Sequence, residues 1–314
     1  MLHVQVVSPA ELTGRLVAML TADPGVLNLV VLRAAAARPD GDAVQFDLTR
    51  ASANSVLKHM RDLGLTRRGP VILGTVEAAL TDETRQEAAW DPSYHGDQAP
   101  VWELVEARIR SDAHYSPSFF LLLIFAGLIG ASGILTNSQI LVVGAMVVGP
   151  EYSAIIAVAL GIDRRRRQPV VRGLVALIAG FTFAIAVTYL FALAIRASGE
   201  TPRAYLNGVR PVSDLINSPN LFSVVVAVIA GLVGVVSLTQ ARSSALTGVF
   251  ISVTTIPAAA DIGVSLAYRS WPEARGSLVQ LLLNVGLLIV VGALALRAQR
   301  AFWQAWQRRR RPLT

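Results

Sequence analysis

Six long apolar segments limit the fold of this chain more than any other feature of its sequence. They lie at residues 118–136, 139–162, 170–196, 221–238, 244–268 and 277–297. Because an α-helix rises about 1.5 Å per residue, each segment is long enough to cross a hydrocarbon layer of roughly 30 Å. The sequence therefore predicts an α-helical integral membrane protein with six transmembrane helices in residues 117–299.

Charge divides the chain into two parts. Residues 1–116 contain 11 basic and 15 acidic side chains, whereas residues 117–314 contain 17 and 6. The arginines of the second part cluster beside apolar segments, at 164–167 and in a basic tail at 300–314. Such clusters are typical of cytoplasmic membrane flanks and do not indicate a nucleic-acid partner. We therefore expect a multi-pass protein in the lipid bilayer, with both termini in the cytoplasm.

The first 76 residues predict a small α+β cytoplasmic domain. Strands are expected at 2–7, 26–33, 43–48 and 70–76, with one helix following Ser8-Pro9 and a second at 51–63. Alternating apolar residues indicate the strands and a 3.6-residue periodicity indicates the helices. The resulting βαββαβ order is that of ferredoxin-like domains. By fold analogy such a domain serves as a small-ligand sensor, as a dimerisation module, or only as a folding module.

Residues 77–116 predict a linker followed by an interfacial helix. The stretch 77–98 is acidic and rich in turn-forming residues, and the next one has Val101, Leu104, Val105 and Ile109 on one helical face. Trp102 and Tyr115 are suited to the lipid headgroup layer. We expect this helix to lead into the membrane. The N-terminus lacks the charged start and apolar core of a signal peptide.

No enzyme chemistry is indicated by the sequence. There is no GxxxxGK[ST] loop, no HExxH motif, no cysteine, and no histidine in the six apolar segments. Neighbouring His and Asp residues in the polar linker are more typical of a solvated surface than of a metal site. We therefore expect no catalytic residues, no metal and no cofactor.

An internal repeat relates the two halves of the membrane part. The sequence AGLIGASGILTNS at 126–138 matches AGLVGVVSLTQARSS at 230–244, and each is followed by a segment that a proline interrupts, Pro150 or Pro257. A duplicated unit of three segments must cross the membrane in the opposite direction, because three is odd. Inverted repeats with broken helices are typical of secondary transporters. Duplication also produces channels and inert scaffolds.

The membrane part resembles a known family in three blocks: GILTNSQILVVGAMVVGP, LINSPNLFSVVVAVIAGLVGVVSLT and SSALTGVFISVTTIPAAADIGVSLAY. They are similar to the bacterial membrane proteins grouped as domain-of-unknown-function family 389, over about residues 118–297. The resemblance implies a location in the bacterial cytoplasmic (inner) membrane and supplies no activity. Glu151 and Tyr152 stand where the family commonly has a Leu-Met-Gly-Pro run.

The break at Gly149-Pro150 suggests a site near the middle of the membrane. We expect Pro150 and Pro257 to begin second half-helices whose N-termini converge there, because proline loses no needed hydrogen bond at a first helical position. Each N-terminus carries roughly half a positive charge, which makes the buried Glu151 tolerable. The candidate substrate- or ion-binding residues are Glu151, Pro150, Pro257, Asp261, Asn137, Ser138, Ser243, Ser244, Thr255 and Asn284, with Gln240 and Thr254 as further polar neighbours.

Two mechanisms are open at this site. Vacant helix N-termini bind an anion if Glu151 is protonated, whereas ionised Glu151 and Asp261 attract a cation or relay protons. Asp261 could instead be only a cap of its half-helix nearer the outer surface. We expect a transporter or channel for a small polar or charged solute, which could be coupled to protons and regulated by the cytoplasmic domain. The alternative is a non-transporting sensor or scaffold whose ferredoxin-like domain binds a cytosolic ligand or partner.

Assembly is a separate expectation. With two helices on one face of a four-stranded sheet, the other face of the N-terminal domain is free for pairing. We expect a homo-oligomer, with a dimer favoured, held partly through this domain.

Overall fold

The computed structural model describes residues 1–76, 100–239 and 254–310, except for the side chains of Thr75 and of residues 306–310. This chain divides into two compact units, Met1–Val105 and Glu106–Thr314. The linker expected at 77–98 lies outside the described residues. The same is true of Gln240, Ser243 and Ser244.

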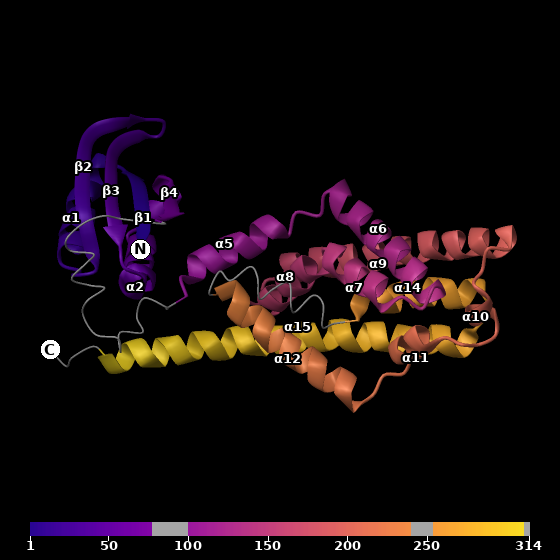
Figure 1. Cartoon of the computed structure of the whole chain (residues 1–314). Helices are drawn as coiled ribbons and strands as arrows, with labels where there is room; N and C mark the ends of the chain where they lie inside the picture. The colour runs from indigo at the N-terminus through magenta and orange to yellow at the C-terminus, as the bar shows by residue number, and fades with distance from the viewer. Residues whose placement is uncertain (77–99, 240–253, 311–314) are drawn as a thin grey trace. The chain divides into compact units, whose positions relative to one another are not determined.

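The first unit is a four-stranded antiparallel sheet with helices, as the sequence predicts (Figure 1). Its elements are β1 (Leu2–Ser8), α1 (Ala10–Thr21), β2 (Val26–Ala37), β3 (Asp40–Leu48), α2 (Arg50–Asp62), α3 (Leu65–Arg68) and β4 (Val71–Thr75). The strand order across the sheet is β2-β3-β1-β4. The expected order of strands and main helices is present, and the short helix α3 is an addition that the sequence analysis missed.

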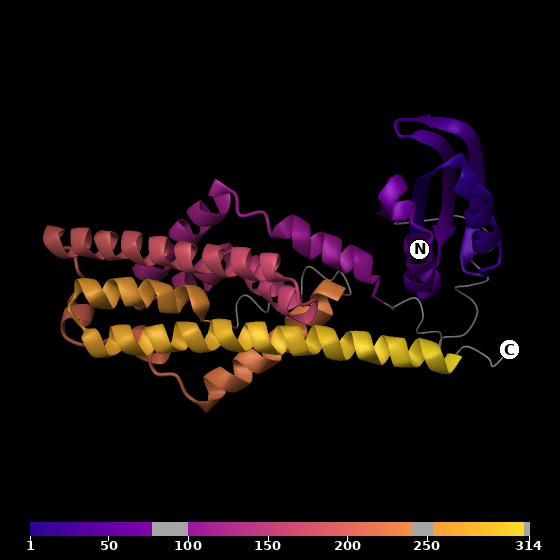
Figure 2. The ribbon, with the colours of Figure 1, turned by 180° about the vertical axis from the view of Figure 1, so that it is seen from behind.

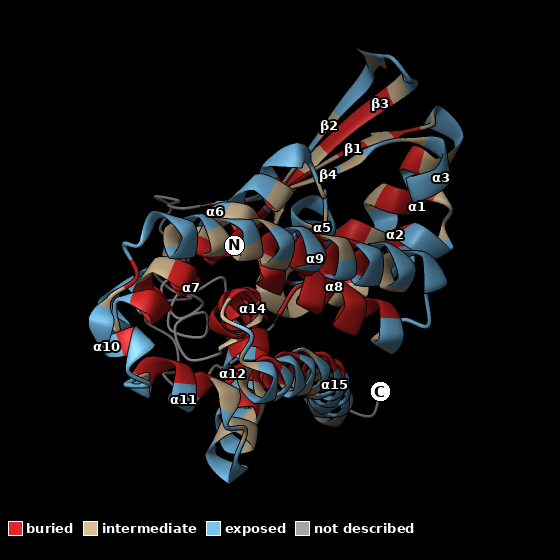
Figure 3. Cartoon of the chain, turned by 90° about the vertical axis from the view of Figure 1, so that its right-hand side faces the viewer, coloured by how far each residue is buried: buried red, intermediate tan, exposed pale blue. Residues whose placement is uncertain are grey.

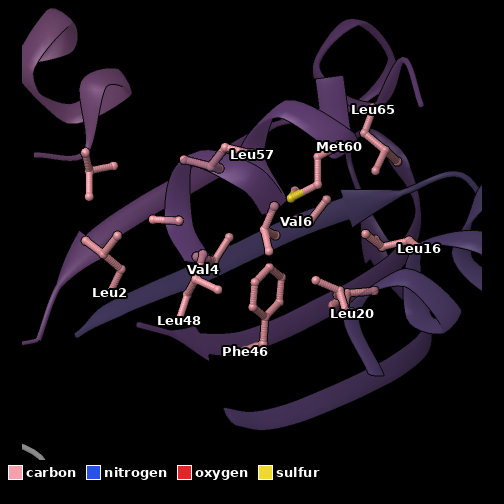
Figure 4. Close-up of a cluster of buried hydrophobic side chains, with 14 residues drawn as sticks. Leu2, Val4, Val6, Leu16, Leu20, Phe46, Leu48, Leu57, Met60 and Leu65 are labelled. Atoms are coloured by element: carbon pink, nitrogen blue, oxygen red, sulfur yellow. The ribbon is translucent and has the colours of Figure 1, made fainter. Parts of the chain in front are cut away.

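Alternation along the strands decides which sheet face the helices cover. Leu2, Val4 and Val6 of β1 point to the same side as Phe46 of β3 and are fully buried against the two helices (Figure 4). Residues paired across the strands share a face, so Val30, Gln45, Gln5 and Ile72 form one row on the other side. Val30 and Ile72 are exposed there. The described residues thus leave this face uncovered.

Helix α5 (Trp102–Asp112) crosses the boundary between the two units, and its first residues belong to the first. Asn54 of α2 donates a hydrogen bond to the Pro100 carbonyl (3.0 Å) and accepts one from the Trp102 N–H (3.2 Å). Val101 joins the apolar core of the sheet and its helices. Trp102 is therefore buried in protein. Its predicted place in the headgroup layer is wrong, because Asn54 fixes this end of the helix.

The second unit is helical and has the composition of a multi-pass membrane protein. Its described helices are α6 (Pro117–Leu135), α7 (Gln139–Val148), α8 (Glu151–Asp163), α9 (Arg167–Ser198), α10 (Arg203–Leu206), α11 (Pro211–Asn217), α12 (Leu221–Thr239), α14 (Thr255–Ala267) and α15 (Trp271–Arg310). Within the described ranges, α6, α9, α12 and α15 are long and apolar enough to span a membrane, and the bent pair α7–α8 would be a fifth span.

The structure describes only part of one predicted segment and extends another into a longer helix. The described part of segment 244–268 is the short helix α14, and its earlier residues lie outside the described chain. The last segment, 277–297, lies within α15, and this helix continues to Arg310. The basic tail expected at 300–314 therefore begins inside a helix. The polar end of this helix is continuous with its apolar part.

Two short helices occupy the middle of this unit and longer helices surround them. Nearly every residue of α14 is buried, and so are most residues of α8, as the red ribbons in Figure 3 show. The surrounding helices instead expose large apolar side chains, among them Phe125, Ile178 and Leu282. Apolar residues that face outward are expected where lipid is the solvent. The centre is therefore the part of this unit most removed from lipid.

A constant spacing relates the helices of the two halves. The separation is 104 residues from Pro117 to Leu221, from Glu151 to Thr255 and from Arg167 to Trp271, where three pairs of helices begin. Helices α6 and α12 both have 19 residues, and α8 and α14 both have 13. In Figures 1 and 2, α9 and α15 run in opposite directions. Helices α8 and α14 also extend away from each other.

Candidate functional site

The apolar run that contains Gly149-Pro150 is broken there, as the sequence predicts. Helices α7 and α8 meet at an angle of 51°. Pro150 is the N-cap of α8, and Glu151 is its first residue. Proline is tolerated in this place because the first N–H groups of a helix have no partner within the helix. The carboxylate of Glu151 thereby stands in the first turn, where the helix dipole favours a negative charge.

The second proline does not occupy the equivalent position. Helix α14 begins at Thr255, so Pro257 is its third residue and not its first. The spacing of 104 residues pairs Pro150 with Thr254, whereas the two prolines are 107 positions apart. Pro257 still lies in the first turn, where its missing N–H costs no helical hydrogen bond. The two helices thus start at equivalent residues, and the prolines only mark the same turn.

The N-termini of α8 and α14 meet directly. The Thr255 hydroxyl donates a hydrogen bond of 2.6 Å to Oε1 of Glu151. The two residues are each other's equivalents in the repeat, 104 positions apart. Gly149 packs just as closely, because a Cβ atom there would lie 2.7 Å from Cγ1 of Ile256. The contact between equivalent residues places the junction of the two halves at Glu151.

A set of polar side chains continues from this junction into α15. Nδ2 of Asn284 donates to the Thr254 hydroxyl at 3.0 Å, and Nε2 of Gln280 donates to the same oxygen at 3.3 Å. Thr254 is the neighbour of Thr255, so its Cα lies about 3.8 Å from that of Thr255. Gln280 and Asn284 are almost fully buried. Glu151, Thr254, Thr255, Gln280 and Asn284 are called the junction cluster below.

Two acceptor atoms of the junction cluster are left without a partner. Oε2 of Glu151 and Oε1 of Gln280 are buried and accept no hydrogen bond from any described residue. Glu151 itself is only 6% exposed. An unsatisfied buried polar atom costs about 1–3 kcal/mol, and more if it is charged. Such atoms persist where a ligand, an ion or water supplies the missing partner.

Asp261 lies in a different environment from Glu151. It is fully buried, and it accepts hydrogen bonds from the hydroxyls of Ser213 (2.7 Å), Ser277 (2.6 Å) and Ser265 (3.4 Å). These serines come from α11, α15 and α14. Asp261 is six residues beyond Thr255, which is about 9 Å along the helix. Glu151 and Asp261 therefore share no hydrogen-bond partner among the described residues.

Asn137 and Ser138 lie in the turn between α6 and α7. Ser138 caps α7 by accepting from the Leu141 N–H (3.4 Å), and Asn137 donates to the Val209 carbonyl (2.9 Å). Helix α7 separates this turn from Gly149 by about 15 Å. Both residues were expected to line the site. The structure places them in a turn and does not bring them to the junction cluster.

Gln280 and the three serines around Asp261 were not predicted from the sequence. A signal for two of these residues was present in α15, where Ser277, Gln280 and Asn284 are three and four residues apart. Such spacing places polar side chains on one face of an otherwise apolar helix. Ser213 had no comparable signal, because it lies in the short helix α11.

Comparison with known proteins places part of this chain in a family. Residues 146–290 match the family model described as Domain of unknown function (DUF389). The matched range includes the junction cluster and Asp261, and it is shorter than the resemblance expected over 118–297. No curated protein and no solved structure matches the chain. The candidate site thus lies within a DUF389 domain, residues 146–290.

Proposed function

We propose that this protein is a transporter or channel for a small polar or charged solute, with the junction cluster as its binding site. One observation carries the proposal: Glu151 is buried, stands where two helix N-termini meet, and has one oxygen without a partner among the described residues. A buried, incompletely paired carboxylate within a membrane segment is costly and marks an ion or substrate pathway by default.

The repeat supports an inverted-repeat architecture of six membrane segments. The spacing of 104 residues and the opposite directions of α9 and α15 are the features expected of two inverted three-helix units. The contact of Glu151 with its own equivalent supports a binding site on the pseudo-two-fold axis of the repeat. Rocking of one half against the other about this axis would expose the site to either side of the membrane in turn. The arginine clusters support cytoplasmic termini in a bacterial inner membrane.

Of the two open mechanisms, we favour cation binding or proton relay. The vacant atoms at the site, Oε2 of Glu151 and Oε1 of Gln280, are both acceptors. Vacant acceptors recruit a cation or a hydrogen-bond donor, whereas an anion would require vacant donors. Among the described residues, no arginine or lysine hydrogen-bonds to either side chain. The helix N-termini oppose this choice only in part, because Glu151 already offsets their positive ends.

Flux through purified protein in liposomes tests the proposal. Ion- or solute-dependent uptake should occur in the wild type and fall about tenfold or more in Glu151→Gln, because a hydrogen bond to a charged group contributes about 1.5–3 kcal/mol. Protonation of Glu151 removes its charge, so cation uptake should decrease between pH 8 and pH 5. An anion carried with a proton would show the opposite slope. Equal pH profiles in both proteins would remove Glu151 from the mechanism.

The second candidate function is a membrane sensor or scaffold that does not transport. It is favoured by the uncovered sheet face of the N-terminal unit, which has the βαββαβ order of a ferredoxin-like domain and exposes Val30, Leu32 and Ile72. The same face supports pairing of two copies as a homodimer. Native mass spectrometry in mild detergent should show a dimer that weakens when residues 1–76 are deleted. A monomer in both proteins would contradict the pairing, and ligand binding by this unit without any flux would favour the sensor.

A further inference from the structure

A basic cavity of about 770 Å³ opens in the second unit, separate from the junction cluster. Its wall is formed by the second half of α5, by Tyr115, by the end of α8 and by the start of α9. Helix α8 ends at Asp163 and α9 begins at Arg167, so the cavity lies where the membrane segments reach their polar flank. A volume of this size is typical of sites for small molecules.

The charges around the cavity are unbalanced. Among the residues that the structure describes, five arginines line it against a single acidic side chain, Glu106. Glu106 pairs with two of them, Arg110 at 2.9 Å and Arg164. The other three, Arg166, Arg167 and Arg172, make no ion pair with any residue that the structure describes. Three positive charges at one cavity repel each other unless an anion binds between them.

Two further hydrogen-bond donors face the same space. The hydroxyl of Tyr115 is buried and has no partner among the described residues. Burial raises the pKa of Tyr115, so the phenol keeps its proton at neutral pH and remains a donor. Helix α9, of 32 residues, starts at the cavity with Arg167. The N–H groups of Arg167 and Gln168 have no partner within the helix and point toward an anion at its N-terminus, whereas the third residue, Pro169, has no N–H. Arginines, a phenol and a helix N-terminus are all suited to phosphate oxygens.

We propose that this cavity binds a phosphate-bearing anion, which is either the headgroup of an acidic phospholipid or a free phosphate compound. Arg166, Arg167 and Arg172 supply the charge, and the Tyr115 hydroxyl supplies an uncharged donor. Guanidinium groups pair with phosphate through two parallel hydrogen bonds, which compact ammonium groups cannot form. This site does not depend on transport by the junction cluster, because it shares no residue with it.

The test compares two double variants of the full-length protein that lose the same charge. Arg166→Gln with Arg172→Gln removes two arginines that line the cavity. Arg108→Gln with Arg165→Gln removes two nearby exposed arginines that do not line it. Each protein is purified in a zwitterionic detergent. Binding is measured with inorganic pyrophosphate by calorimetry and with short-chain phosphatidylglycerol by native mass spectrometry, with phosphatidylcholine as the lipid control.

The cavity variant should bind its phosphate probe about tenfold or more weakly than the wild type, because each arginine–phosphate contact is charge-assisted. The control variant should stay within about twofold of the wild type. Loss of phosphatidylglycerol binding alone assigns a lipid headgroup, and loss of pyrophosphate binding assigns a free phosphate compound. Equal affinity of the two variants for both probes would overturn the proposal, and so would a wild type that binds neither probe.

Discussion

Glu151 and Asp261 are both buried carboxylates in the membrane unit, yet their surroundings differ. Asp261 accepts from three serine hydroxyls, at least one for each of its oxygens. Glu151 accepts from one threonine, and its second oxygen has no partner among the described residues. A fully paired buried carboxylate holds helices together, whereas an incompletely paired one is available to a ligand. Burial alone therefore does not identify a functional carboxylate.

The largest difference that we expect between the two carboxylates is the change in protein stability when each is replaced by its amide. Asp261→Asn replaces a carboxylate oxygen, which accepts from serine hydroxyls, with an amide NH₂ group, which can only donate. We therefore expect the free energy of unfolding to fall by about 2–4 kcal/mol. Glu151→Gln should change it by less than about 1 kcal/mol, because a charge with one unpaired oxygen is replaced by a neutral group of the same shape. Thermal unfolding of both variants in detergent measures the difference.

The control for this experiment is Asp214→Asn, an exposed change on α11, the helix that carries Ser213. Its melting temperature should match that of the wild type. If Asp261→Asn were as stable as Asp214→Asn, the three hydroxyls would not anchor the helices, and Asp261 would join Glu151 as a candidate ligand group.

A smaller effect is expected from closing the space beside Glu151. In Gly149→Ala the new Cβ atom would clash with Oε2 of Glu151 and would lie 2.7 Å from Cγ1 of Ile256. The carboxylate must move away, so flux should fall several-fold, with a stability loss of about 1–3 kcal/mol from overpacking. Gly144→Ala is the matched control on α7, because no described residue beyond the neighbouring helix backbone lies within 4 Å of its Cβ position. It should leave flux unchanged, and a similar loss in both variants would point to a general effect on α7.

The link between the two halves can be tested at Thr255. Thr255→Val removes the hydroxyl that binds Oε1 of Glu151 and keeps the shape of the side chain. We expect a loss of about 1–2 kcal/mol in stability and altered ion affinity, because Glu151 then loses its one hydrogen-bonded side-chain partner among the described residues. Thr255→Ser keeps the hydroxyl and should behave almost as the wild type. Ion binding in the two variants, measured by calorimetry, separates the hydrogen bond from simple packing.

The smallest effect is expected for a carboxylate outside the membrane unit. Asp42 in β3 is buried and accepts from the Ala34 N–H (2.8 Å) and from Arg33 (3.3 Å). The Ala34 hydrogen bond is the main cause that lowers the pKa of Asp42. Ionised Asp42 therefore contributes fully to folding stability above its pKa in the unfolded chain, which is about 3.9. This contribution is lost as the pH falls through the lower pKa of Asp42 in the folded protein.

Hydrogen exchange of the β2–β3 hairpin measures this effect. Protection in the wild type should decrease as the pH falls below about 4, after correction for the intrinsic exchange rate. In Asp42→Asn the hairpin should be less protected near neutral pH and should lose this additional decrease. An unchanged acid response in Asp42→Asn would show that another group is responsible.

Local sequence patterns were sufficient to predict the types of secondary structure and the membrane segments of this protein. Period-two alternation in Leu2, Val4 and Val6 predicted a strand, since the pleat sends alternate side chains to opposite faces. Apolar segments such as 170–196 predicted helices that span a membrane, because hydrocarbon leaves the backbone few other ways to satisfy its hydrogen bonds. Gly149-Pro150 predicted the break between α7 and α8. Each of these inferences depends on neighbours in the chain.

The contacts between polar groups of distant segments could not be predicted in this way. Glu151 and Thr255 are 104 residues apart, and their contact depends on how the two halves pack. The pairing of Asp261 with Ser213 and the turn position of Asn137 were equally hidden, because no local pattern encodes a hydrogen bond between distant helices. Trp102 was misplaced for the same reason, since Asn54 holds its backbone. Composition and periodicity specify which faces are buried, and the packing of those faces then selects the partners.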